Sequence, residues 1–209
     1  MSEADGAPFV PTLETKRLLV RPLLETDLAA VHRLYLDIDW VDTSLPQTEL
    51  YDRHASWLAW TSSSYRELER LYQPPLGDRA VARKADGAMI GLVGLVPSFA
   101  PFGQLPGFGG AAKALRTMEM GLFWAISPDA QGQGYATEAA AALVDWAFEG
   151  LLLDRLVATT EHDNAASIAV MRRLGMRIET NPQPDPPWLQ TVGVLRAIDR
   201  VSPTPAESP

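Results

Sequence analysis

The stretch from Thr117 to Phe148 constrains the fold most, because an alternating strand leads through a glycine turn into a helix. Residues 117–126 alternate between two faces, with Met118, Met120, Leu122, Trp124 and Ile126 on one and Glu119, Gly121, Phe123 and Ala125 on the other. The turn contains Gly132 and Gly134, and the helix continues to about Phe148. Such a turn gathers unpaired backbone N–H groups and the positive end of a helix dipole at one spot, which suits a phosphate or pyrophosphate.

Helical and strand patterns elsewhere in the chain define the fold class. Helices are predicted from Thr26 or Asp27 to Leu36, over 50–72, and over 164–174, where Gly175 ends the last one. Further strands are predicted over 15–22, 79–84, 88–96, 155–161, 176–180 and 191–198. The predicted fold is α/β (α+β), with a mixed, mostly antiparallel sheet of six to seven strands and helices on both faces.

Length and composition determine the expected domain organisation. The 209 residues, 46% of them hydrophobic, fit a single domain over 15–201, with a flexible leader over 1–14 and a disordered Pro/Ser tail over 202–209. Seven of the fourteen residues in 97–110 are Gly or Pro, so we predict a long excursion over 97–116, either a lid or an inert loop.

Composition also excludes several classes of function. The chain has no cysteine, which removes disulfides, thiolate metal sites and cysteine nucleophiles. The N-terminal sequence lacks the pattern of a secretory signal and no apolar run is long enough to span a membrane, so we expect a cytoplasmic protein without a membrane partner. A net charge of −8 argues against nucleic-acid binding and favours cationic partners such as amines.

The glycine turn alone does not identify its ligand. A P-loop has Lys and then Ser or Thr after its last glycine, where this chain has Tyr135 and Ala136. A dinucleotide fingerprint has a third glycine, where this chain has Thr137, and an acid at the end of the next strand about 20 residues later. Asp154 has this separation but precedes the predicted strand, whereas Glu161 ends it, so the dinucleotide fingerprint fits poorly. A turn with a purely structural role remains an alternative.

Three sequence blocks together resemble the GNAT superfamily of acyl-CoA-dependent N-acyltransferases, and within it the RimJ/RimL-like branch. Gln131-x-x-Gly134-x-Ala136 is similar to the Q/R-x-x-G-x-G/A motif that holds the pyrophosphate of acetyl-CoA. Residues 164–176 resemble the N-x-x-S-x-x-V-M-x-x-L-G-F/M helix of that branch, and residues 13–23 resemble its L-E-T-x-R-L-x-L-R-P-L first strand. The blocks stand in the family's order and spacing, and the resemblance covers residues 12–198.

The resemblance implies a site for acetyl-CoA as the acyl donor. It implies that the pantetheine arm lies between the strands 117–126 and 155–161, and that no metal or covalent intermediate is required. The residues that the resemblance assigns to donor binding are Phe123, Trp124, Ala125, Ile126, Gln131, Gly132, Gln133, Gly134, Tyr135, Ala136, Thr137, Asn164 and Ser167.

Acetyl transfer also needs a proton for the departing thiolate and a base for the amine. Many members of the superfamily carry a tyrosine seven residues after the motif asparagine, where this chain has Met171. In the RimJ/RimL-like branch a serine hydrogen-bonds the sulfur instead, and Ser167 fills that position, although Asn164 and Ser167 also fit a simple helix cap. Glu119 is the first candidate base and His162 the second, with a structural strand carboxylate and a surface histidine as the alternatives.

The expected acceptor is a primary amine, either a protein N-terminus or a small molecule such as an aminoglycoside or polyamine. Several aromatic side chains could line an acceptor pocket or belong to the core, and several acids could attract the amine or lie on the solvated surface. These residues are Tyr35, Trp40, Trp57, Trp60, Trp188, Asp37, Asp39 and Asp42. A non-catalytic acyl-CoA-binding regulatory module and a nucleotide-dependent oxidoreductase are the alternative functions. The resemblance also implies a homodimer.

Overall fold

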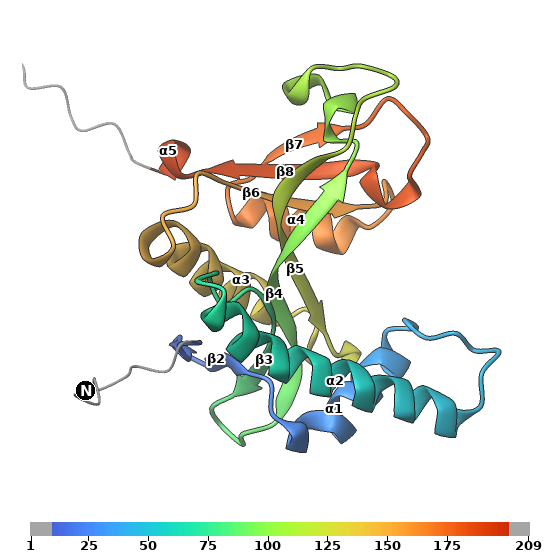
Figure 1. Cartoon of the computed structure of the whole chain (residues 1–209), viewed down its shortest axis with the longest axis vertical. Helices are drawn as coiled ribbons and strands as arrows, with labels where there is room; N and C mark the ends of the chain where they lie inside the picture. The colour runs from blue at the N-terminus through green and yellow to red at the C-terminus, as the bar shows by residue number, and fades with distance from the viewer. Residues whose placement is uncertain (1–9, 201–209) are drawn as a thin grey trace, which may run out of the picture. The chain divides into compact units, whose positions relative to one another are not determined.

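The computed structural model describes residues 10–200 (Figure 1). Its strands are β1 (Leu13–Glu14), β2 (Leu18–Pro22), β3 (Gly77–Arg83), β4 (Met89–Ala100), β5 (Thr117–Ile126), β6 (Arg155–Thr160), β7 (Arg177–Thr180) and β8 (Thr191–Arg196). Its α-helices are α1 (Leu28–Asp37), α2 (Gln47–Arg70), α3 (Tyr135–Asp145), α4 (Ala165–Arg173) and α5 (Ala197–Arg200). Residues 1–9 of the predicted leader and the predicted tail over 202–209 lie outside the described residues.

The strands form a sheet in the order β1-β2-β3-β4-β5-β6-β8-β7. Neighbouring strands are antiparallel in β1–β2, β2–β3, β3–β4, β6–β8 and β7–β8, whereas β5 and β6 are parallel. The prediction of a mixed, mostly antiparallel sheet is therefore confirmed, with eight strands instead of six to seven. The additional strand is β1, a two-residue pairing of Leu13 with Val20 and of Glu14 with Leu19 inside the segment predicted as a leader.

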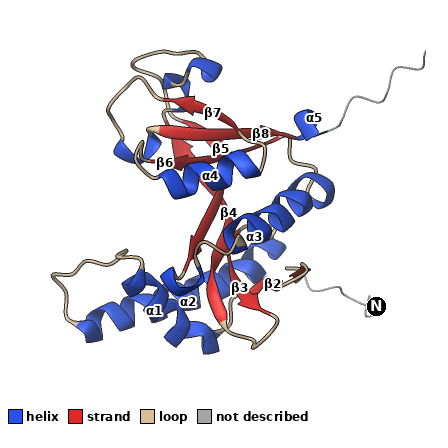
Figure 2. Ribbon diagram, turned by 180° about the vertical axis from the view of Figure 1, so that it is seen from behind, coloured by secondary structure: helices blue, strands red, loops and turns tan. Residues whose placement is uncertain are grey.

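The chain divides into two compact units, which we describe separately. Unit 1 contains residues 10–96 and 122–143, and unit 2 contains residues 97–121 and 144–200. In unit 1, α2 crosses in front of β3 and β4 in Figure 1. In Figure 2, which is the view from behind, α3 lies closer to the viewer than α2. A core cluster of unit 1 combines Leu23, which follows β2, with side chains from α1, α2, β3 and β4, and Phe123 of β5 packs against it. The members from these four elements are Val31, Leu34, Leu58, Ala80 and Leu92. Among residues 10–200, no helix is both long and apolar enough to cross a membrane.

The excursion over 97–116 is part of the core of unit 2. Two 3-10 turns, Phe102–Gln104 and Pro106–Phe108, place Phe102 and Leu105 at 0% exposure against side chains of β6 and β8. The Asn181 side chain donates to Gln104 Oε1 at 2.9 Å, and the Gly107 N–H donates to Glu179 Oε2 at 2.8 Å. Phe102 and Leu105 therefore anchor the segment in the core of unit 2, whereas Phe99 and Leu115 remain exposed.

Candidate functional site

The glycine turn connects β5 to α3 in unit 1 and leaves space at its surface. Gln131 anchors the turn, since its Nε2 donates to the Ile126 carbonyl at 2.9 Å. Gly132 and Gly134 have φ angles of +72° and +80°, a region that L-residues with a side chain rarely adopt. A Cβ at Gly132 would meet no atom within 4 Å, so the backbone of the turn is open to a ligand.

Arg17, which sequence reasoning missed, braces the turn. Its Nε donates to Glu138 Oε2 at 2.6 Å, and its Nη1 donates to the Gln133 carbonyl at 3.0 Å. Its guanidinium also lies 4.3 Å from the centroid of the Tyr135 ring. Burial opposes ionisation of Glu138, but hydrogen bonds from Thr15 and Arg17 outweigh this effect and lower the pKa of Glu138. The sequence signal for Arg17 was its place in the family-like block over residues 13–23, two residues after Thr15.

The turn and the first turn of α3 suit an anionic phosphate group. Backbone N–H groups in the first turn of an α-helix have no partner within the helix. Thr137 Oγ1 is buried, and no group among residues 10–200 hydrogen-bonds to it. With the open backbone at Gly132, the free N–H groups of this first turn fit a pyrophosphate.

In unit 2, Asn164 and Ser167 lie at the start of α4. The Ser167 N–H donates to Asn164 Oδ1 at 3.0 Å, so Asn164 caps this helix. The prediction that Asn164 can cap this helix is therefore confirmed. Ser167 is half-buried, and within the described part of the chain no hydrogen bond engages its Oγ.

Met171 stands where many members of the superfamily carry a tyrosine. Its side chain is 0% exposed. Its Cγ and Sδ atoms lie 3.1 Å from where a Cβ would stand at Gly193 of β8, so Met171 packs into the core of unit 2. This position contributes packing and no proton donor.

The two candidate bases lie in different environments. Glu119 is 8% exposed and accepts two hydrogen bonds from Arg155, at 2.8 Å from Nε and 2.6 Å from Nη2. Phe108 covers this pair, with its ring centroid 4.8 Å from the Arg155 guanidinium carbon. Both carboxylate oxygens of Glu119 are therefore engaged by Arg155. His162 is exposed, and its Nδ1 lies 3.3 Å from Thr191 Oγ1.

Aromatic side chains of α1, α2, β5 and the segment after α1 meet in unit 1. We call this group the aromatic cluster: Tyr35, Trp40, His54, Trp57 and Phe123. Tyr35 stacks on His54 with 4.9 Å between ring centroids, and Trp40 lies 5.5 Å from Phe123. Trp40 nevertheless remains 54% exposed, so the cluster reaches the surface. His54 and its neighbour His32, whose Nδ1 atoms are 2.9 Å apart, were not among the predicted residues. Trp60 is 67% exposed and makes no ring contact within residues 10–200.

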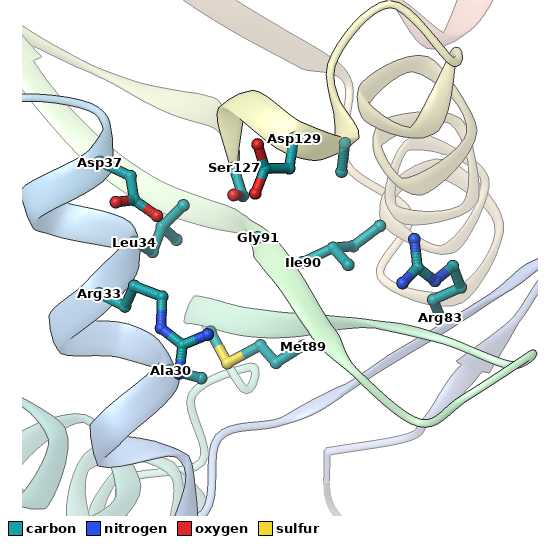
Figure 3. Close-up of a pocket in the computed structure, with 11 residues that line it drawn as sticks. Ala30, Arg33, Leu34, Asp37, Arg83, Met89, Ile90, Gly91, Ser127 and Asp129 are labelled. Carbon is teal, nitrogen blue, oxygen red and sulfur yellow. The ribbon is translucent and has the colours of Figure 1, made fainter.

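The three acids near the end of α1 differ in their contacts. Asp42 accepts hydrogen bonds from the backbone and the side chain of Ser44, which fixes a turn and lowers the pKa of Asp42. Asp39 follows α1 with a φ of +60°. Asp37 lines a pocket of about 210 Å³ in unit 1 (Figure 3), together with Ala30, Arg33, Leu34, Arg83, Met89, Ile90, Gly91, Ser127, Asp129 and Ala130. None of the predicted donor-binding residues lines that pocket.

Comparison with known proteins establishes the family. Residues 17–177 match the acetyltransferase (GNAT) domain, which covers more than half of the chain. The chain therefore belongs to the GNAT acetyltransferase family and is an acyltransferase.

Individual relatives are more distant. The chain is 41% identical over 63 residues to the uncharacterized N-acetyltransferase YnaD of Bacillus subtilis, a match that covers 30% of this chain and 36% of that protein. It is 29% identical over 167 residues to the spermidine N(1)-acetyltransferase of Escherichia coli K12, covering 77% and 73% of the two chains. The structure of Mycobacterium smegmatis RimJ in complex with CoA-disulfide matches 88% of this chain and 84% of that one, with 20% identity and a TM-score of 0.61. The fold that the resemblance predicts is therefore confirmed, and it is shared with this RimJ structure.

Proposed function

We propose that this protein transfers an acetyl group from acetyl-CoA to a primary amine, by direct attack within a ternary complex. The observation that carries the proposal is the open glycine turn, with Arg17 beside it and the unpaired Thr137 hydroxyl behind it. Two relatives support it, since one was solved in complex with CoA-disulfide and another is a spermidine acetyltransferase.

Each proposed residue has a defined task in this reaction. Backbone N–H groups of residues 132–137 bind the pyrophosphate, whereas the Gln131 N–H donates to the Pro128 carbonyl and Arg17, paired with Glu138, holds the turn in place. Backbone N–H groups of residues 123–126 polarise the thioester carbonyl. Ser167 Oγ, which has no partner within residues 10–200, donates a hydrogen bond to the departing thiolate. The C–N bond forms as the C–S bond breaks, so no covalent enzyme intermediate is needed.

Turnover separates this proposal from the alternatives. A regulatory module would bind acetyl-CoA without releasing free thiol in the presence of any amine. An oxidoreductase would be stabilised by NAD(P)H instead of acetyl-CoA, and the family match gives that alternative no support.

Ser167→Ala tests the proposed function directly. We expect kcat to fall about tenfold to a hundredfold, because the thiolate loses its hydrogen-bond donor, while the affinity for acetyl-CoA stays the same. The assay follows free thiol release with N-terminal Ala and Ser peptides, polyamines and aminoglycosides as acceptors. Ser64→Ala is the matched control, because the Ser64 hydroxyl donates to the Trp60 carbonyl on the exposed side of α2. An unchanged kcat in Ser167→Ala would refute the role of Ser167, and a wild-type protein that releases no thiol with any amine would refute the function.

A further inference from the structure

One carboxylate in unit 1 lacks the partner that buried carboxylates normally have. Asp78 lies near the start of β3, and its Oδ1 is buried without a hydrogen bond from any group among residues 10–200. Tyr65 donates its hydroxyl proton to the backbone carbonyl of Asp78, not to its carboxylate. A carboxylate oxygen that is shielded from water and has no donor is costly, so this position needs an explanation.

The backbone around Asp78 makes room for this carboxylate. Asp78 pairs with Gly94 across β3 and β4. A Cβ at Gly94 would lie 2.5 Å from Asp78 Oδ1, so the carboxylate occupies space that any other residue at position 94 would fill. Because strand side chains alternate, Asp78 shares a face with Ala80, which packs in the core formed with α1 and α2.

The same face carries the aromatic cluster. Burial raises the pKa of Tyr35 to about 12, and the charge of Asp78 contributes to that rise, so the two side chains are within electrostatic reach. Tyr35 stacks on His54, and Phe123 of β5 packs against the same core. Burial also raises the pKa of Asp78 to about 6, which is close to the pH at which a proton acceptor works best.

Four other carboxylates with little exposed surface already form ion pairs with arginine. Both oxygens of Glu119 accept from Arg155, and both oxygens of Asp27 accept from Arg21. Glu138 is held by Arg17, and Glu179 pairs with Arg177. Asp78 differs from these four in that no ion pair among residues 10–200 holds its carboxylate, although Glu179 Oε1 is likewise buried without a hydrogen bond.

We propose that Asp78 and the aromatic cluster form the acceptor site, in which Asp78 binds the ammonium group of a cationic primary amine and takes one of its protons. The exposed ring of Trp40 contacts the cation or its alkyl chain. This inference rests on the proposed function. In the complex, the ammonium group of the substrate forms an ion pair with the otherwise uncompensated charge of Asp78.

The protons balance in this step. The ammonium group gives one proton to Asp78, and the neutral amine attacks the thioester carbonyl, so that a C–N bond forms and the C–S bond breaks. The thiolate takes the second proton from the nitrogen, and the amide keeps the third. Asp78 then releases its proton to water and is ready for another turnover.

Asp78→Asn tests the inference through activity and stability together. We expect kcat/KM for the amine to fall at least about a hundredfold, with an unchanged affinity for acetyl-CoA. We also expect a higher melting temperature at neutral pH, because asparagine buries no charge. The folded-state pKa of Asp78 is raised from 3.8 to about 6, so its ionisation lowers stability as pH rises through that window, and this pH dependence should be absent in the variant. Tyr65 of α2 and Tyr35 of α1 are the titratable groups that face Asp78, and they ionise well above that window.

The matched control is Asp86→Asn, which makes the same chemical change at an exposed carboxylate in the turn between β3 and β4. It should leave amine kinetics and acetyl-CoA affinity at wild-type values. A second variant, Trp40→Ala, removes an exposed ring without threatening the fold, and it should raise KM for the amine about tenfold.

Spermidine binding, followed by calorimetry, tests the site independently of turnover. Wild-type protein should bind spermidine, and Asp78→Asn should lose that binding, even if acetyl transfer itself proved absent and the proposed function failed. Amine kinetics or spermidine binding within twofold of wild type in Asp78→Asn would overturn the inference. A lower melting temperature in this variant would also overturn it, since it would show that Asp78 stabilises the fold.

Discussion

Phe102→Ala is expected to lower the free energy of unfolding by about 3–4 kcal/mol, because it deletes a fully buried ring from the core of unit 2. Phe102 belongs to the 97–116 excursion, whose Gly and Pro content is typical of a surface loop. Its ring packs with Ala100, Leu105, Val157 and Leu189, all of which are 0% exposed. The loss should therefore match that of a core residue and not that of a loop residue.

Phe99→Ala is the matched control, since Phe99 lies three residues earlier in the same excursion but is 60% exposed. It should change the free energy of unfolding by less than about 0.5 kcal/mol. Urea unfolding followed by circular dichroism measures both variants. Equal, small losses would show that the excursion is detached from the core, as a lid would be.

Glu119→Gln is expected to lower the free energy of unfolding by about 2–3 kcal/mol. The substitution removes the buried carboxylate and leaves Arg155 without its charged partner. Glu49→Gln provides the control, since Glu49 forms an exposed ion pair with Arg53 on α2. Breaking that pair should cost less than about 0.5 kcal/mol.

The same variant decides whether Glu119 acts as the general base. If Glu119 mainly supports the structure, Glu119→Gln assayed well below its melting temperature should keep kcat/KM for the amine within a few-fold of wild type. A loss of about a hundredfold or more in a folded Glu119→Gln variant would assign the base to Glu119 and contradict the structural role. Kinetics and urea unfolding on one preparation distinguish these outcomes.

Elements with local periodicity were predictable from sequence. The strand predicted over Thr117–Ile126 has those bounds in the structure, and the helix predicted over 164–174 forms over Ala165–Arg173. The glycine turn was also predictable, because positive φ angles at Gly132 and Gly134 follow from residue type and spacing. In each case the determining contacts lie within a few residues of one another.

Contacts between distant residues were not predictable in this way. The bond between Arg17 and Glu138 joins residues 121 positions apart, and nothing local at either residue signals it. The ion pair of Glu119 with Arg155 depends on the parallel pairing of β5 with β6. The carboxylate of Asp78 likewise appears unusual only when β3 lies beside Gly94 of β4. Strand pairing and tertiary packing decide these features, and neither is encoded in a local pattern.

The central claim, that the glycine turn binds the acyl donor, is tested most directly by calorimetric titration of acetyl-CoA into Gly132→Ala and Gly87→Ala. Both glycines have a φ of +72°, and a Cβ at either would meet no atom within 4 Å. Both variants should therefore lose a similar stability of about 1 kcal/mol from backbone strain alone. We predict that Gly87→Ala binds acetyl-CoA like the wild type, whereas Gly132→Ala binds it at least about tenfold more weakly, because its methyl group stands where the pyrophosphate meets the backbone. Equal affinities in the two variants would contradict the claim.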